Sequence, residues 1–241
     1  DPIGVDEPLH VVVGAVTLVG QLLHEHVVVV AHAEPDGGQA GALVGLIPLF
    51  AVETLESDLL EKLPRFRRRM EWFIKYRPHL VSDVCPLTEP GQEGRFLLSL
   101  VSRQQLERVM QRMLDSKEFL SDFGLRSLSR FHAEQPYVLE VDGQVHLVRY
   151  EPAESTTNLF GGNSNWRGPI WYPVNYLMIE SLRKYHAYYG DSLRVEMPVG
   201  SGERATLDQV ATDLSRRLTR LFLPDRQNGG CRPAGLSTSR S

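Results

Sequence analysis

The stretch GGNSNWRGPIWYPVNYLMIESLRKYHAYYGD, residues 161–191, places a Gly- and Asn-rich loop directly before an amphipathic helix. The mainly apolar residues of the helix recur at intervals of three and four: Val174, Leu177, Met178, Ser181, Leu182, Tyr185 and Tyr189. Pro173 suits the first helical turn, and Gly190 is placed to end the helix. We therefore predict a helix that begins near Tyr172 and covers a hydrophobic core with one face.

The loop before this helix has the composition of a carbohydrate site. Its Trp and Tyr rings offer flat apolar faces to the C–H groups of a pyranose, and its Arg and Asn side chains supply donors and acceptors for the hydroxyl groups. We predict that five residues of this stretch bind substrate: Asn165, Trp166, Arg167, Trp171 and Asn175.

Three of these residues have an alternative role that involves no sugar. Trp171 would serve equally well as a core aromatic at the start of a helix. Arg167 would pair with Glu151 or Glu154 and lock the loop. Asn175, one turn into the helix, would hold the loop backbone through its amide group.

Two further helices are predicted from the same kind of pattern. One spans residues 103–115, where Ser102 and Gln105 fit a capping box. Its apolar face is formed by Leu106, Val109, Met110, Met113 and Leu114. The other is opened by Thr206 and Gln209, and its apolar face is formed by Leu207, Val210, Ala211, Leu214, Leu218 and Leu221.

A basic stretch and a hairpin complete the pattern. The helix expected within residues 63–78 carries Arg65, Arg67, Arg68 and Arg69, which we interpret as a solvated face rather than a binding patch. Residues 137–141 and 144–150 alternate around Asp142-Gly143, a strong signal for a two-residue β-turn. The long loop that follows, residues 151–170, is of a length and composition typical of functional loops.

These features together resemble glycoside hydrolase family 63, in particular its bacterial glucosidase and mannosylglycerate-hydrolase-like group. Besides residues 161–191, four segments resemble that group in the expected order: LVGLIPLFAVETLE (43–56), LPRFRRRMEWFIKYRP (63–78), QRMLDSKEFLSDFGLRSLSRFH (111–132) and MPVGSGERATLDQVATDLSRRLTRLFL (197–223). The resemblance implies a mainly α fold over residues 44–225: part of an α/α toroid of the six-hairpin glycosidase type, with one inserted β-hairpin. It also implies that Phe123–Ser129 faces the pocket, which adds Arg126 to the predicted substrate-binding residues.

The resemblance further implies hydrolysis of α-linked glucosides or glycosylglycerate-type substrates with inversion, which uses two carboxylates about 6.5–9.5 Å apart. In the family pattern the acid belongs upstream of residue 44 and the base downstream of residue 225. Asp122, Glu151 and Glu154 lie near the pocket segments, but their spacing gives them no catalytic role, so the catalytic residues are unknown. We expect a glycosidase fragment without its catalytic pair; the alternative is a non-catalytic module that binds carbohydrate or another protein.

The two ends of the chain do not resemble the family. Residues 1–61 contain no Lys or Arg, and Val-rich runs near the start suggest strands that a helical toroid would not use. We expect residues 1–43 to be an atypical segment, either a frame-shifted translation or a divergent terminus. Residues 226–241 are expected to be a low-complexity tail. The apolar run at residues 11–23 is shorter than the ~20 residues of a spanning helix, and no basic residue precedes it as in a signal peptide.

Composition limits the kinds of partner. The hydrophobic fraction of 42% suits a packed domain, and the formal charge of −4 disfavours nucleic acid and anionic membranes, so we expect an oligosaccharide or glycoside as the ligand. His24, Glu25, His26 and His32 raise the idea of a metal-dependent hydrolase, but no convincing third ligand accompanies them, and we expect no metal and no cofactor. Cys85 and Cys231 are expected to be thiols; they do not settle the compartment, for which our expectation is cytoplasmic.

Overall fold

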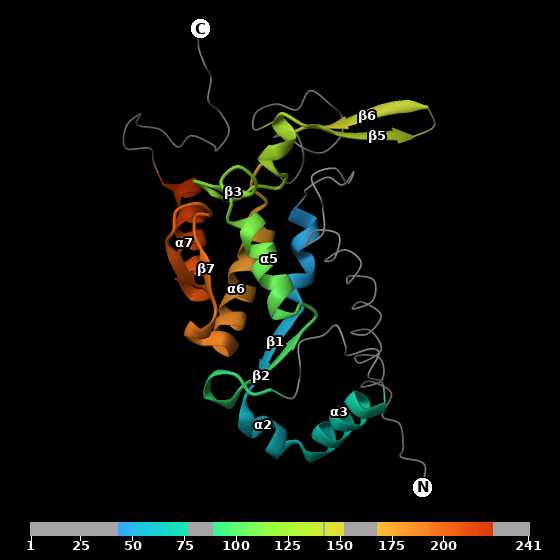
Figure 1. The fold of residues 1–241 in the computed structure, drawn as a ribbon, viewed down its shortest axis with the longest axis vertical. Helices are drawn as coiled ribbons and strands as arrows, with labels where there is room; N and C mark the ends of the chain where they lie inside the picture. The colour runs from blue at the N-terminus through green and yellow to red at the C-terminus, as the bar shows by residue number, and fades with distance from the viewer. Residues whose placement is uncertain (1–42, 77–88, 142, 152–167, 224–241) are drawn as a thin grey trace.

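The computed structural model describes residues 43–76, 89–141, 143–151 and 168–223 (Figure 1). About half of these residues are helical, and the strands form only two-stranded antiparallel sheets. This composition agrees with the predicted mainly α class, whereas the α/α toroid stays a prediction. The expected segments 1–43 and 226–241 lie almost entirely outside the described residues.

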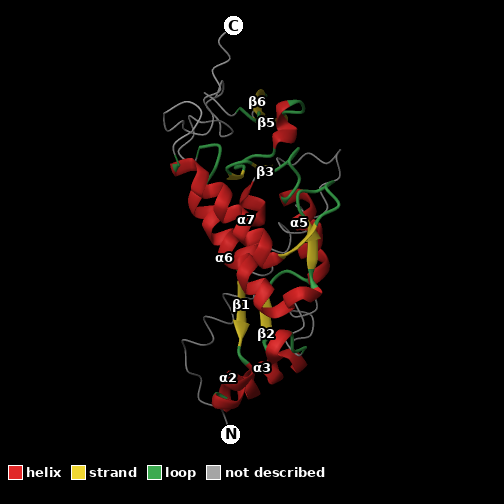
Figure 2. Ribbon diagram, turned by 90° about the vertical axis from the view of Figure 1, so that its left-hand side faces the viewer, coloured by secondary structure: helices red, strands yellow, loops and turns green. Residues whose placement is uncertain are grey.

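Three helices surround the core: α5 (Arg103–Met113), α6 (Tyr172–Tyr189) and α7 (Leu207–Thr219). Helices α6 and α7 lie side by side in both ribbon views (Figures 1 and 2). The 3₁₀ helix η1 (Leu43–Phe50) packs on α6 and buries Leu43, Leu46 and Leu49. Because apolar faces from all four elements meet, the core is continuous between them.

The helix starts are set by the predicted capping boxes. In α5 the N–H of Gln105 donates to Ser102 Oγ at 3.3 Å, and the N–H of Ser102 donates to Gln105 Oε1 at 2.9 Å. Thr206 and Gln209 exchange the same two hydrogen bonds at the start of α7, at 3.3 and 2.9 Å. Each box satisfies two backbone N–H groups that would otherwise lack partners, so both predicted helices are confirmed.

Helix α6 begins at Tyr172 and ends before Gly190, as predicted. Its buried surface is broader than the predicted stripe, because Asn175, Ile179 and Tyr188 are buried as well. Leu177, which the stripe included, is instead exposed. Helix α6 is therefore covered on two sides, by α7 and by the first sheet.

Three of the four sheets were not predicted. Strand β1 (Val52–Leu55) pairs with β2 (Phe96–Ser99), and β7 (Arg194–Glu196) pairs with β8 (Arg204–Thr206). The predicted hairpin is confirmed as β5 (Tyr137–Val141) and β6 (Gln144–Val148), although the second strand ends two residues earlier than expected. The fourth sheet joins β3 (Leu120–Ser121) to β4 (Gly124–Leu125) within the segment expected to face the pocket.

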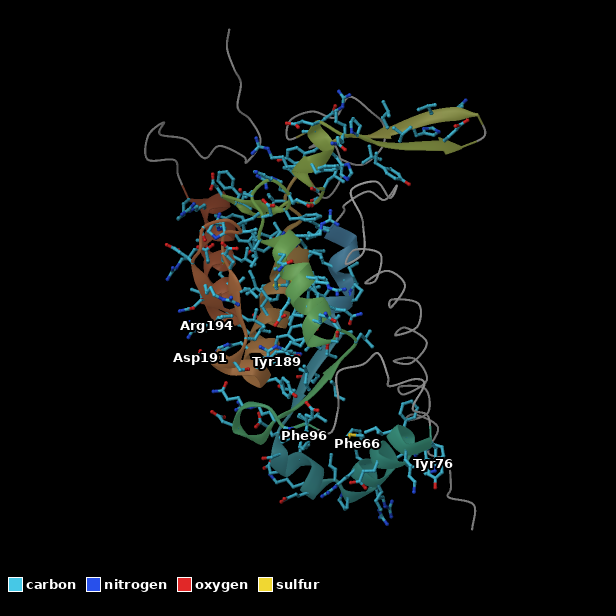
Figure 3. All side chains as sticks on the ribbon, in the orientation of Figure 1. Phe66, Tyr76, Phe96, Tyr189, Asp191 and Arg194 are labelled. Carbon is cyan, nitrogen blue, oxygen red and sulfur yellow. The ribbon has the colours of Figure 1, made fainter. Side chains whose placement is uncertain are left out.

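Helices α2 (Ser57–Lys62) and α3 (Pro64–Tyr76) form an arm at the end of the molecule away from the hairpin (Figure 1). No residue of α3 is buried, so its basic cluster is a solvated face, as the sequence predicted. Phe66 and Tyr76 lie on this arm in Figure 3, apart from Tyr189 at the end of α6 and from Asp191 and Arg194, which follow that helix.

Short 3₁₀ helices complete the description: η2 (Gln92–Gly94), η3 (Arg130–Ala133), η4 (Gly190–Ser192) and η5 (Arg220–Phe222). Among the described helices, none has the length and apolar character needed to cross a membrane.

Candidate carbohydrate site

The candidate site lies where Leu125–Ser127 runs beside the residues that lead into helix α6. Arg126 forms an antiparallel bridge with Ile170. The backbone N–H of Ser127 donates to the carbonyl oxygen of Pro169 at 2.8 Å. The segment near residue 126 and the end of the predicted sugar-binding loop are therefore adjacent, whereas their place in a sugar pocket stays a prediction.

Asn175 is buried, with 1% of its surface exposed, and its amide is bonded to backbone groups. Oδ1 accepts from the N–H of Leu125 at 2.7 Å, while Nδ2 donates to the carbonyl of Leu125 and to that of Trp171, each at 3.0 Å. Both amide hydrogens are thus used within the protein. This geometry favours the alternative in which Asn175 holds the backbone; its direct contact with a sugar stays a prediction.

Arg126 is also largely enclosed, with 9% of its surface exposed. Its Nη1 group donates to the carbonyls of Ser116 and Glu118 at 3.2 Å and to that of Leu120. Its Nε group donates to the hydroxyl of Tyr150 at 3.2 Å, and the guanidinium carbon lies 5.8 Å from the centre of that ring. Neutral oxygens and an aromatic face therefore solvate this charge, with no carboxylate in salt-bridge contact among the described residues.

The remaining predicted residues lie partly within the described ranges and partly outside them. Trp171 stands at the N-cap of α6, half-buried, and packs against the core. Tyr176, one turn later, is exposed. Asn165, Trp166 and Arg167 lie outside the described residues, so their contact with a sugar, like that of Trp171, stays a prediction.

Two acidic residues near this end, Glu118 and Asp122, lie beside basic groups. The carboxylate of Glu118 lies 3.2 Å from Arg112 and accepts from the hydroxyl of Ser129 at 3.1 Å. The side chain of Asp122 is 83% exposed and 3.9 Å from Arg217. Glu154 lies outside the described residues, and within them no His, Cys, Asp and Glu group could hold a metal ion.

Sequence reasoning missed Tyr150 and Gly124. Tyr150 supplies the hydroxyl bonded to Arg126, and nothing in its local sequence distinguishes it from a hairpin residue. Gly124 has φ +116°, and a Cβ there would lie 2.9 Å from Asn175 Oδ1 and 2.9 Å from Leu218 Cδ2. The Gly after Asp122-Phe123 was a visible signal of a turn, but its close approach to two helices was not.

A known family model matches the central part of the chain. Residues 95–201 match the model of the glycosyl hydrolase family 63 C-terminal domain. This span contains β2, α5, the Leu125–Ser127 segment, the hairpin and α6. The chain is therefore glycoside hydrolase-like across the elements that build the candidate site.

Two similar proteins come from Saccharomyces cerevisiae. "Uncharacterized protein YMR196W" is 44% identical over 189 residues, which are 78% of this chain and 17% of that protein. Mannosyl-oligosaccharide glucosidase is 32% identical over 94 residues, which are 38% of this chain and 8% of that protein. This chain thus matches less than a fifth of the length of either relative, and the bacterial subgroup stays a prediction.

Proposed function

We propose that residues 44–225 form part of an α/α-toroid glycoside hydrolase domain that binds a glycoside or oligosaccharide where helix α6 begins. The family match carries this proposal, because its span includes both the predicted sugar-binding stretch and the segment packed against it. The name of the relative mannosyl-oligosaccharide glucosidase supports α-linked glucose as the preferred sugar. Glycosylglycerate-type substrates are the second choice within the same class.

Substrate contacts are proposed for the aromatic and polar residues at the mouth of helix α6. Trp171 stands there at the N-cap of the helix, and Asn165, Trp166 and Arg167 precede it by four to six residues in the chain. Rings would stack on the C–H face of the pyranose, while the guanidinium and amide groups would bind its hydroxyls. The protein carrying this site is expected in the cytoplasm.

Hydrolysis with inversion is proposed for the complete domain, whereas this chain is expected to bind without turnover. The reaction needs a general acid and a general base about 6.5–9.5 Å apart. Two acidic residues described near the site, Glu118 and Asp122, face Arg112 and Arg217. This pairing favours the second candidate function, a non-catalytic carbohydrate-binding module, for the chain in isolation.

Isothermal titration with glucose-containing oligosaccharides, run beside a sensitive hydrolysis assay, tests both parts. Trp166→Ala should weaken binding about two- to twelvefold, since a stacked aromatic contributes about 0.5–1.5 kcal/mol. Glu180→Ala is the control: Glu180 pairs with Arg183 at 2.8 Å on the outer face of α6, and its loss should leave binding unchanged. Equal effects of the two substitutions on binding would show that Trp166 has only a structural role. If the chain binds no oligosaccharide, the proposed site is wrong. If the chain hydrolyses the oligosaccharide, the proposal that it lacks the catalytic pair is wrong.

A further inference from the structure

One short segment, Leu125–Ser127, contacts the chain on both sides of residues 152–167. On the C-terminal side, the hydroxyl of Ser127 donates to the carbonyl of Gly168 at 2.8 Å, next to the backbone bond between Ser127 and Pro169. On the N-terminal side, the Arg126 guanidinium reaches the hydroxyl and ring of Tyr150. The positions at which the chain enters and leaves this stretch are thus tied to the same three residues.

Asn175 fixes the segment to helix α6 in the way that a neighbouring strand would. Its amide accepts from the N–H of Leu125 and donates to the carbonyl of the same residue, so both peptide groups of Leu125 are satisfied by one side chain. The second amide hydrogen bonds to the carbonyl of Trp171. Because Asn175 is buried, water would not replace its hydrogen bonds to these backbone groups if the side chain were removed.

Arg126 fixes the segment from its other side. Its Nη1 group lies among the carbonyls of Ser116, Glu118 and Leu120, and its Nε group donates to Tyr150. A guanidinium can serve the carbonyls and the Tyr150 hydroxyl together because its donors are spread over a rigid plane, whereas an ammonium has its donors on one atom. The bond to Tyr150, in addition to the carbonyls, therefore favours Arg over Lys.

We propose that Arg126 and Asn175 are positioning residues of the carbohydrate site: together they set the distance between Tyr150 and Trp171, through the Leu125–Ser127 segment that lies between these two side chains. The proposal rests on the proposed function for the identity of the ligand. It assigns both side chains to holding the site rather than to touching the sugar.

Two variants of the full 241-residue chain test the hydrogen bonds that attach the Leu125–Ser127 segment to Tyr150 and to helix α6. Tyr150→Phe removes the hydroxyl that accepts from Arg126 and keeps the ring beneath the guanidinium. Asn175→Asp keeps an acceptor for the N–H of Leu125 and removes both donors. Ser99→Ala is the control, because it breaks a buried hydrogen bond of 2.8 Å to Tyr185 in a part of the core that contacts neither side of the site.

Hydrogen exchange measured by mass spectrometry reports how firmly the Leu125–Ser127 segment is attached, and it needs no ligand. We expect peptides that contain residues 125–127 and 168–171 to exchange about fivefold faster in Tyr150→Phe and Asn175→Asp, since each loses hydrogen bonds of the segment. Ser99→Ala should leave these peptides unchanged while it lowers the melting temperature. Unchanged exchange at residues 168–171 in both site variants would overturn the proposal.

Titration with a glucose-containing oligosaccharide then tests whether the attachment of this segment affects sugar binding. Both site variants should bind about fivefold more weakly than the parent chain, and Ser99→Ala should bind within about twofold of it. Faster exchange with unchanged affinity would overturn the positioning role. If the parent chain itself binds no sugar, the proposed function fails, whereas the exchange data still decide whether Arg126 and Asn175 hold the segment.

Discussion

Helices α3 and α7 have the same length, 13 residues, and both carry apolar and basic residues at helical spacing, yet only one of them is packed. Helix α7 buries Leu207, Val210, Ala211, Leu214 and Leu218 against the core. Helix α3 buries none of its residues and lies on the arm, at the end of the molecule opposite to the hairpin (Figure 1). The difference lies in their neighbours rather than in the two sequences.

The aromatic residues of α3 show the consequence. Trp72 and Tyr76 lie against each other, with ring centroids 5.4 Å apart, but remain 52% and 56% exposed. In α7, by contrast, the apolar stripe meets α6 along its length. Helical periodicity therefore predicts which residues share a face, whereas burial requires another element that covers that face.

The strongest test of this contrast is Leu214→Ala in α7. Leu214 is fully buried, so the substitution should lower the free energy of unfolding by about 2–5 kcal/mol, measured by urea denaturation. Trp72→Ala in α3 removes a larger side chain from an exposed site and should change that free energy by no more than about 0.5 kcal/mol. A comparable loss from both substitutions would show that α3 is packed in solution.

A smaller effect is expected where α7 approaches the candidate site. Gly124→Ala combines a strained φ of +116° with a Cβ 2.9 Å from Leu218 and from the amide of Asn175, and should cost about 1–3 kcal/mol. Gly143→Ala in the hairpin also has positive φ, at +74°, but meets nothing within 4 Å. Backbone strain alone should cost about 1 kcal/mol there. Equal costs in urea denaturation would mean that the contacts with α6 and α7 add nothing.

The same contrast explains which elements the sequence predicts. Helices α5, α6 and α7 carry start and stop signals within their own sequences, such as the Thr206–Gln209 box and Gly190, and the hairpin carries Asp142-Gly143. Sheets β1–β2 and β7–β8 have strands of only three or four residues, too short for a clear alternation. In the first sheet the pairing joins Val52 to Ser99, a contact that no local pattern encodes.

The candidate site divides in a similar way. Its location at the start of α6 follows from the composition of the loop and from Pro173. The roles of Asn175 and Arg126 do not, because they depend on contacts with Leu125, Tyr150 and three carbonyls that only the folded chain brings together. An Asn in a polar, aromatic-rich stretch has the same sequence signature whether it binds a hydroxyl or a peptide group.

The smallest predicted effect concerns an ion pair that ties α6 to β1. Partial burial alone would raise the pKa of Glu53, but the ammonium of Lys184 at 2.6 Å and the N–H of Thr54 at 3.0 Å outweigh it and hold that pKa below its ordinary 4.5. A carboxylate with a lower pKa in the folded state stabilises the protein above the pKa of the unfolded chain. This stabilisation disappears as the pH falls through the pKa of the folded state.

Glu53→Gln should therefore reduce the free energy of unfolding near neutral pH by no more than about 0.5–1 kcal/mol, because solvent screens this half-exposed pair. The difference from the parent chain should shrink as the pH falls through the pKa of Glu53 in the folded state, because the carboxyl is then protonated in both states. Asp58→Asn on the arm is the matched control: its partner Lys62 lies in the same short helix, so no change in the urea midpoint is expected. If the difference in free energy of unfolding between Glu53→Gln and the parent chain were the same at every pH, the loss would come from packing of the amide. The charge of Glu53 would then not contribute to the contacts that join α6 to the first sheet.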